Sequence, residues 1–300
     1  MPEPSAEEIL DANVRYHDLA SQSYDSKWGI DYGEKGAAQV LGKMRKALGQ
    51  PLRPMGRGLE IGAGTGYFSL NLLKQGILSE VTCTDVSPGM LEALAGSAEQ
   101  MHLDVETVVC DAESLPFESS SFDVVFGHAV LHHIPDLERA FSEFRRVLTP
   151  GGLVAFCGEP SRTGDKLAAY PKRAALAAAP LWRRAMGARE HTGPDGSWGK
   201  DEEAKLEAHV DVHAFAPEDL ERAARAGGFK TVRIKGEELA ASWFGWANRT
   251  LESTAEPSDV PWLWRRYAFH GYLALQEVDR RVLEPYLPPA IFYNLLISAS

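Results

Sequence analysis

The sequence has few cysteines and lacks long apolar runs. Only Cys83, Cys110 and Cys157 occur, and no two of them form a CxxC pair. An odd cysteine count without such a pair argues against a disulfide framework and against a zinc site. No apolar run approaches the roughly 18 residues of a membrane-spanning helix, and the first ten residues do not resemble a signal peptide. We therefore expect reduced, buried thiols and a cytoplasmic location.

Positive charge is scarce in the first half of the chain. The formal net charge is −11, and residues 1–160 hold 12 Lys and Arg against 23 Asp and Glu, whereas residues 161–300 hold 19 of each. An acidic surface repels a phosphate backbone, so we expect no nucleic-acid partner. Six of the seven tryptophans lie in the second half, which indicates that the two halves have different roles.

Short apolar runs alternate with helix-length amphipathic runs between residues 57 and 160. Strands that alternate with helices pair in parallel through right-handed crossovers, so the pattern predicts an α/β sheet flanked by helices. The predicted strands are 57–61, 79–86, 104–113, 121–130 and 153–160, and the predicted helices are 66–76, 87–101 and 136–148.

The alternation breaks after residue 160. Helix-prone stretches follow at 165–190 and 238–284, and residues 215–236 between them return to the pattern of a helix followed by a strand. We predict a core with N-terminal helices, a first helical insertion, a return to the core, a second helical insertion and a final core strand. These parts span 1–160, 161–214, 215–236, 237–287 and 288–300, respectively.

The segment LEIGAGTG at 59–66 carries the strongest sign of a ligand. A strand that runs into closely spaced glycines and then a helix lets backbone N–H groups approach a ligand. The glycines at 62, 64 and 66 follow GxGxG, whereas the dinucleotide fingerprint GxGxxG would need a glycine in place of Tyr67. A tight turn that binds nothing is the alternative interpretation.

Two acids stand at the predicted ends of the next two strands. Asp85 can accept hydrogen bonds from both hydroxyls of a ribose at the sheet edge that adjoins the glycine loop. Its alternative role is to cap the following helix, but Ser87 already suits that position. Asp111, followed by Ala112 and Glu113, is placed to accept a hydrogen bond from an adenine amino group.

These motifs resemble those of class I S-adenosylmethionine (SAM)-dependent methyltransferases, most closely the ubiquinone/menaquinone-biosynthesis-like group that acts on small molecules. The resemblance covers residues 15–160 and rests on LEIGAGTG, TDVSPGML, CDAESLPFESSSFDVV, HAVLHHIPD and FRRVLTPGGLVAF. It implies a Rossmann-like sheet flanked by helices, with the helical insertions of the C-terminal half as a lid. It also implies SAM as cofactor and S-adenosylhomocysteine (SAH) as product.

The resemblance further implies which residues hold the cofactor. The glycine loop would face the methionine part of SAM, with Glu60 at its amino group. The N-terminal segment would fold over the cofactor, unless its tyrosines form only a helix surface. The implied residues are Tyr16, Tyr24, Glu60, Gly62, Ala63, Gly64, Gly66, Asp85, Val86, Met90, Asp111, Ala112, Glu113 and Gly127.

Three histidines, His128, His132 and His133, follow the fourth predicted strand beside the expected methyl group. Histidine suits proton removal from a hydroxyl or an activated carbon, because its ordinary pKa is about 6.5. Structural packing at the start of the next helix is the alternative. We place a catalytic base among the three, with His128 or His132 ahead of His133.

The later histidines and basic residues have two interpretations each. His209, Asp211 and His213 alternate as metal ligands can, but we expect no metal there. Asp211 and His213, with Trp28, are instead candidate substrate contacts.

Residues 166–189 hold six basic side chains and no acid. This stretch suits contact with an anionic membrane or lipid substrate, or else a solvated helix face.

The sequence as a whole predicts a SAM-dependent methyltransferase that acts on a small, hydrophobic metabolite, at oxygen first and at carbon second. The alternative is a SAM- or SAH-binding module without turnover that acts in regulation or assembly. A macromolecular substrate is disfavoured, because the negative charge opposes RNA and no NPPY-like motif follows the fourth strand. The pattern is compatible with a monomer or a homodimer.

Overall fold

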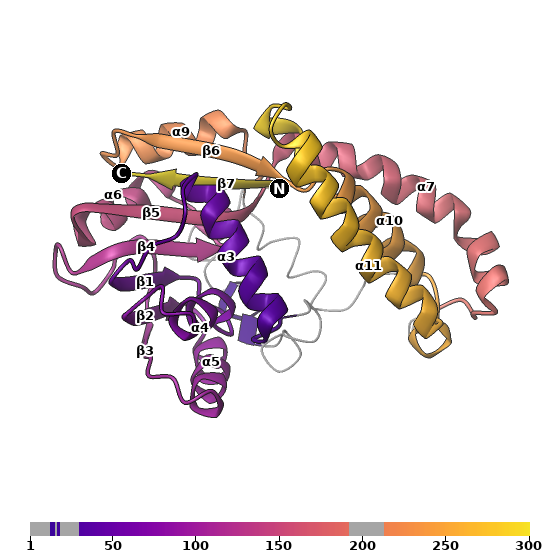
Figure 1. Cartoon of the computed structure of the whole chain (residues 1–300), viewed down its shortest axis with the longest axis horizontal. Helices are drawn as coiled ribbons and strands as arrows, with labels where there is room; N and C mark the ends of the chain where they lie inside the picture. Colours follow the sequence, from indigo (N-terminus) through magenta and orange to yellow (C-terminus); the bar gives the residue numbers. More distant parts are fainter. Residues whose placement is uncertain (1–12, 16, 19–29, 192–212) are drawn as a thin grey trace. The chain divides into compact units, whose positions relative to one another are not determined.

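A seven-stranded mixed sheet has the strand order β3-β2-β1-β4-β5-β7-β6 (Figure 1). The computed structural model describes residues 13–15, 17–18, 30–191 and 213–300. Strands β1 to β5 pair in parallel, and β7 runs opposite to its neighbours. The predicted α/β sheet is thereby confirmed. The strands are β1 (Arg57–Ile61), β2 (Glu80–Asp85), β3 (Glu106–Val109), β4 (Phe122–His128), β5 (Leu148–Pro160), β6 (Val232–Glu237) and β7 (Asn294–Ala299).

Helices cover both faces of this sheet. On one face Val40, Phe68 and Leu94, one from each of three helices, join a single apolar cluster with the strands. On the other face Phe141 packs edge-on against Phe229. The first layer comprises α3 (Glu34–Leu48), α4 (Tyr67–Lys74) and α5 (Pro88–Gln100), and the second comprises α6 (Leu137–Val147) and α9 (Pro217–Ala226).

Local sequence signals determine where these helices begin. The Ser87 side chain accepts a hydrogen bond from the Met90 N–H, and Pro88 occupies the first helical position of α5, as the sequence predicts. Asp136 caps α6 in the same way by accepting from the Arg139 N–H. Such caps satisfy N–H groups that have no partner within the helix.

The strand register brings the carboxyl ends of β1, β2 and β4 to one edge of the sheet. Ile61 pairs with Thr84, and Asp85 pairs with Val109. Strand β3 ends before Asp111, because the Asp111 carboxylate accepts from the Glu113 N–H and turns the chain. The expectation that Asp111 ends the strand is therefore wrong by two residues.

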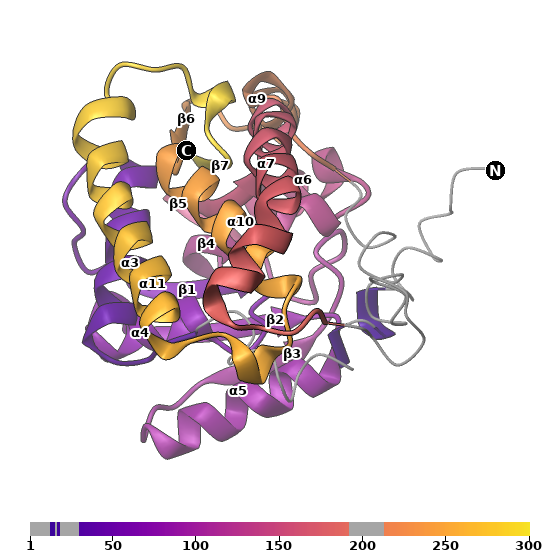
Figure 2. The same cartoon turned by 90° about the vertical axis from the view of Figure 1, so that its right-hand side faces the viewer.

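The chain forms two compact units. The first comprises Met1–Glu159, Asp201–Lys235 and Leu296–Ser300, and the second comprises Pro160–Lys200 and Gly236–Leu295. In the second unit α10 packs against two longer helices, α7 and α11 (Figure 2). Its helices are α7 (Arg162–Met186), α10 (Ala240–Ser253) and α11 (Trp262–Val278), continued by a π-helical turn (Asp279–Leu283).

Short helical turns complete the described part of the chain. Three 3-10 turns occur, η1 (Leu131–His133), η2 (Pro257–Asp259) and η4 (Pro289–Ile291). Within the described ranges no helix combines the length and the apolar character needed to cross a membrane. The turn η1 follows β4 directly, which makes it part of the sheet edge described above.

Candidate active site

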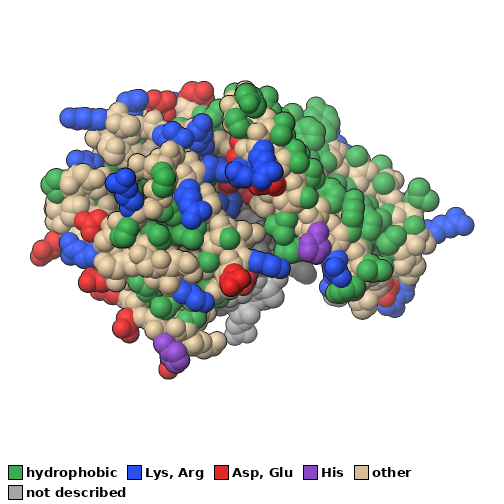
Figure 3. All heavy atoms as spheres, in the orientation of Figure 1, with side chains coloured by type: hydrophobic (Ala, Val, Ile, Leu, Met, Phe, Trp, Pro, Cys, Tyr) green, Lys and Arg blue, Asp and Glu red, His purple; other side chains and the backbone are tan. Residues whose placement is uncertain are grey.

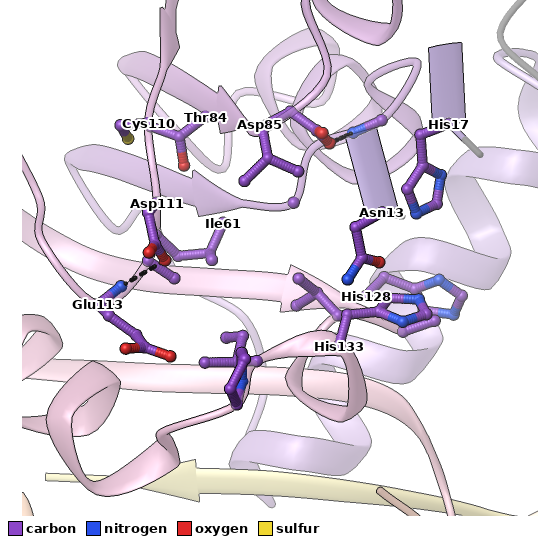
Figure 4. A pocket seen from close by; sticks show the side chains of 18 residues that line it. Asn13, His17, Ile61, Thr84, Asp85, Cys110, Asp111, Glu113, His128 and His133 are labelled. Atoms are coloured by element: carbon purple, nitrogen blue, oxygen red, sulfur yellow. Dashed lines mark hydrogen bonds between the residues drawn. The ribbon is translucent and has the colours of Figure 1, made fainter. Parts of the chain in front are cut away.

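A cavity of about 240 Å³ lies at the edge where β1, β2 and β4 end (Figure 4). Its walls come from the ends of these strands and the loops that follow them, from the loop after β3, and from two N-terminal residues, Asn13 and His17. The residues singled out in the sequence that line it are Gly62, Gly64, Asp85, Val86, Asp111, Ala112, Glu113, His128 and His133. The parallel pairing of β1 to β4 thus brings together residues that are far apart in the sequence.

The glycine loop after β1 forms one wall. Gly62 and Gly64 have φ angles of 60° and 52°, which L-residues other than glycine rarely adopt. The Ala63 N–H donates to the Thr84 carbonyl at 2.8 Å, which holds the loop against β2. A Cβ on Gly62 would overlap the Val130 side chain, whereas a Cβ on Gly64 would meet no atom within 4 Å.

Asp85, the last residue of β2, is held rigidly beside this loop. Its carboxylate accepts from the Gly64 N–H and from the Ser87 N–H, both at 2.9 Å. The side chain lines the cavity although the residue is only 8% exposed. A carboxylate offers about four acceptor positions, so two remain for a ligand.

Asp111 and Glu113 lie at the end of the cavity away from the histidines (Figure 4). Besides its bond to Asp111, Glu113 accepts from the Asp136 N–H at 2.8 Å. Burial raises the pKa of the Glu113 carboxyl above its ordinary value. The two side chains therefore present fixed acceptors to whatever occupies this end.

A smaller cavity of about 50 Å³ lies on the other side of the glycine loop and is lined by Glu60, Ala63, Thr65 and His128. Glu60 accepts from the Ser69 N–H at 3.0 Å, and its burial raises the pKa of the carboxyl to about 8. The Thr65 hydroxyl is buried and has no hydrogen-bond partner among the described residues. Both groups are suited to a polar, cationic ligand.

The Glu60 pKa predicts a pH-dependent stability. Between pH 4.5 and about 8 the folded protein keeps the Glu60 proton that the unfolded chain has released. The free energy of unfolding therefore falls as pH rises through this window. Urea unfolding of the ligand-free protein at several pH values should show this fall in the free energy of unfolding. In the Glu60→Gln variant the fall should be smaller, by on the order of 5 kcal/mol. Parallel pH profiles for the two proteins would contradict this assignment.

Two of the three candidate histidines reach the larger cavity. His128, the last residue of β4, stacks on Phe68 with ring centroids 4.7 Å apart and lines both cavities. His133 lines the larger cavity, 5.6 Å from the ring of His17. A Cβ on Gly158 would lie 2.7 Å from His128 Nε2, so the neighbouring strand needs glycine there.

His132 has a different environment. Its Nδ1 lies 2.9 Å from Oε2 of Glu159, and Glu159 is fully buried. The same carboxylate accepts from three backbone N–H groups of residues 130–132. His132 does not line the cavity and instead ties η1 to β5. The sequence favours His132 over His133 as the base, whereas His133 is the one of the two that lines the cavity.

Other residues singled out in the sequence lie away from the cavities or outside the described residues. Met90 is fully buried in α5, and Gly127 lies within β4, where a Cβ would meet the Ile61 carbonyl. Gly66 is the N-cap residue of α4. The backbone N–H of His213 donates to the His132 carbonyl at 3.2 Å. None of these four lines either cavity. Tyr16, Tyr24, Trp28, His209 and Asp211 lie outside the described residues.

Asn13 and His17 line the larger cavity, although neither is predicted from the sequence. These residues are four apart, so they share one face of the helical segment, and that spacing was the available signal. Asp18 anchors the segment by accepting from Ser87 Oγ at 2.5 Å and from the Gly89 N–H at 3.1 Å. In the described ranges, no group of three or more His, Cys, Asp or Glu side chains is arranged to hold a metal ion.

Comparison with known proteins identifies the family. A model of the methyltransferase domain matches residues 59–156. The malonyl-(acyl-carrier protein) O-methyltransferase of Methylococcus capsulatus is 30% identical over 229 residues, which cover 72% of this chain and 70% of that enzyme. The chain belongs to the class I SAM-dependent methyltransferases. The resemblance inferred from the sequence motifs is therefore confirmed.

Other methyltransferases match over smaller parts or at lower identity. The ubiquinone/menaquinone biosynthesis C-methyltransferase of Ralstonia nicotianae is 34% identical over 140 residues, which cover 46% of this chain and 56% of that enzyme. The structure of a phosphoethanolamine N-methyltransferase from Haemonchus contortus superposes with a TM-score of 0.60 at 18% identity, covering 99% of this chain and 60% of that one. The second comparison shows that the fold is shared.

The residues at the cavities fit SAM, which is the cofactor of this methyltransferase. A Cβ on Gly64 would meet no protein atom within 4 Å, so at this position the glycine loop leaves open space in which backbone groups can approach a ligand. Asp85 keeps free acceptor positions for hydroxyl groups, and Asp111 and Glu113 offer acceptors farther along the wall. The unpartnered Thr65 hydroxyl and buried Glu60 suit the amino-acid part of the cofactor.

Proposed function

We propose that this methyltransferase transfers the methyl group of SAM to an oxygen atom of a small, hydrophobic metabolite. The observation that carries the proposal is a single cavity with fixed carboxylates toward one end and His128 and His133 toward the other (Figure 4). Carboxylates recognise a nucleoside, and histidine can accept the proton of an attacking hydroxyl. One cavity thus combines cofactor recognition with proton removal.

Each side chain has a proposed role. When bound, SAM supplies an electrophilic methyl group that a nucleophile displaces in line. Gly62 and Gly64 hold the methionine part with Glu60 at its amino group, and Asp85 accepts from the ribose hydroxyls. Asp111 accepts from the adenine amino group. Catalysis then depends mainly on positioning the acceptor, because an in-line displacement requires a narrow range of geometries.

The relatives favour oxygen over carbon as the methyl acceptor. The relative that aligns with 72% of the chain is named as an O-methyltransferase, whereas the C-methyltransferase aligns with 46%. The loop with Ile134 and Pro135 and the side chain of Val86 give the cavity apolar walls, which support a hydrophobic acceptor. Carbon remains the second candidate because His128 and His133 suit proton removal from an activated carbon as well.

The proposal is tested by incubating the protein with methyl-labelled SAM and a panel of hydrophobic alcohols, phenols, carboxylic acids and activated-carbon acceptors. Labelled product and equimolar SAH, with the label on oxygen, are the expected result. Label on carbon would establish the second candidate. Tight SAM or SAH binding without labelled product from any acceptor or cell extract would favour the non-catalytic module.

Substitution of the three histidines separates a base from a positioning residue. We expect His133→Ala or His128→Ala to lower kcat by about 10²- to 10⁴-fold while SAM still binds, because that is the usual contribution of a general base. His132→Ala should instead lower the free energy of unfolding by about 1–3 kcal/mol, since buried Glu159 loses a partner. Steady-state kinetics, calorimetry with SAM and urea unfolding measure the three quantities. Unchanged turnover in all three variants would exclude histidine as the base.

The setting of the enzyme is also a proposal. The thiols of Cys83 and Cys157 are buried and form no disulfide within the described ranges, which supports a reducing compartment such as the cytoplasm. We also propose that the protein makes a peripheral contact with an anionic membrane or lipid substrate. It would act as a monomer or a homodimer. An exposed surface of the second unit is relevant to the membrane contact and to the oligomeric state.

A further inference from the structure

Helix α11 of the second unit presents an apolar face to solvent. None of its residues is buried. Trp262 is 64% exposed, Leu263 70% and Tyr267 54%. Phe269 and Val278 are also exposed. Trp262 and Phe269, seven residues apart, lie on one strip of the helix, and Leu263, Tyr267 and Val278, four and eleven residues apart, lie on a neighbouring strip. Figure 3 shows hydrophobic side chains gathered over α11. We call Trp262, Leu263, Tyr267, Phe269 and Val278 the α11 face.

Positive charge accompanies this face. Arg265 and Arg266 are exposed, and no acid occurs between Trp262 and Gln276. The Arg266 guanidinium lies 4.7 Å from the centre of the Trp262 ring. Glu277, the first acid of α11, is paired with two arginines of the following turn. The α11 face is therefore apolar and cationic, although the whole chain has a net charge of −11.

The composition of the α11 face indicates what kind of partner binds to it. Monomeric proteins rarely expose large contiguous apolar patches unless something covers them. A second copy in a two-fold contact would set this face against itself and bring the arginines of both copies together. A helix that combines Trp, Tyr, Phe and Leu with arginine is instead typical of segments that lie at a membrane interface. Anionic phosphate headgroups complement Arg265 and Arg266.

We propose that the α11 face docks on an anionic membrane. The apolar side chains of Trp262 and Leu263 enter the boundary between headgroups and acyl chains, and Arg265 and Arg266 meet lipid phosphates. The remaining acidic surface is repelled, so the charge distribution also orients the protein on the membrane. This docking is independent of methyl transfer, and it would bring the enzyme to the phase in which a hydrophobic acceptor dissolves.

Vesicle co-sedimentation tests the proposal. The full chain is mixed at low salt with vesicles of phosphatidylcholine containing about 30% phosphatidylglycerol, and with vesicles of phosphatidylcholine alone. We expect binding to the anionic vesicles only, and weaker binding as salt is added. The variant Arg265→Gln/Arg266→Gln should bind these vesicles at least about 10-fold more weakly than the unaltered protein, because each basic residue near an anionic surface contributes several-fold to affinity. The variant Trp262→Ser/Leu263→Ser should lose binding.

A matched control removes two exposed arginines elsewhere. Arg222→Gln/Arg225→Gln on α9 changes the net charge by the same amount, and both arginines are paired with acids of their own helix. This control should sediment with anionic vesicles as the unaltered protein does. SAM affinity and circular dichroism of every variant verify that the chain is folded.

Two results would overturn the proposal. One is the absence of binding to anionic vesicles at low salt, or equal binding by the α11 variants and the control. The other is a concentration-dependent dimer that Trp262→Ser/Leu263→Ser abolishes, without any vesicle binding, which would assign the α11 face to a second copy. Light scattering after size exclusion measures the oligomeric state.

Discussion

Replacing Asp85 by asparagine should weaken SAM binding about 30-fold or more. The carboxylate is held by the Gly64 and Ser87 N–H groups, and its remaining acceptor positions are the ones assigned to the ribose hydroxyls. An amide has a single acceptor oxygen, so at least one charge-assisted hydrogen bond of about 1.5–3 kcal/mol is lost. Isothermal titration calorimetry with SAM and with SAH measures the change.

Asp123→Asn provides the matched control for this substitution. Asp123 lies near the start of β4, at the opposite end of the strand from the cavity. Its carboxylate also accepts from a backbone N–H, that of Arg57 at 2.9 Å, and from Thr149 Oγ1 at 3.1 Å. The control should lose some stability and retain SAM affinity. Dissociation constants for Asp85→Asn within threefold of the unaltered protein would contradict the ribose assignment.

Replacing Gly62 by alanine should abolish SAM binding and destabilise the fold. The residue has a φ angle of 60°, which costs alanine about 1–2 kcal/mol. In addition, the new Cβ would overlap Val130, so the glycine loop and η1 must separate. Because Gly62 and Val130 both line the larger cavity, this movement changes the shape of the site. Urea unfolding and calorimetry with SAM report the two effects.

Gly76→Ala separates backbone strain from the collision. Gly76 follows α4 and has a φ angle of 66°, but a Cβ there would meet nothing within 4 Å. This variant should lose only the cost of the left-handed conformation and bind SAM normally. If Gly62→Ala and Gly76→Ala lost the same free energy of unfolding and both bound SAM normally, the close packing of Gly62 against Val130 would not be required for SAM binding.

The sheet and much of the wall of the larger cavity could be predicted because their signals are local. The segment LEIGAGTG combines a strand with glycines, and Asp85 is the last residue of a buried strand. Ser87 and Pro88 mark the start of α5 through residues within one helical turn. Parallel pairing then brings such strand ends together without further information. The approach of these strand ends in space therefore follows from patterns that are each local in the sequence.

The roles of the histidines could not be predicted in this way. His132 and His133 are adjacent, yet His132 contacts Glu159, 27 residues away in the sequence, whereas His133 lines the larger cavity. Which histidine turns inward depends on the bonds that Glu159 makes to the backbone of η1. Met90 shows the same limit, because a helix with apolar residues on several sides does not reveal which one faces a ligand.

The place of β7 in the sheet has a consequence for biosynthesis. This strand lies between β5 and β6, although β6 precedes it in the chain by the whole of α10 and α11. While the ribosome is still translating those helices, β5 has an uncovered edge and β6 has no neighbour. Exposed strand edges pair readily with other chains. The nascent polypeptide therefore depends on rapid completion, or on a chaperone, until residues 294–299 emerge and close the gap.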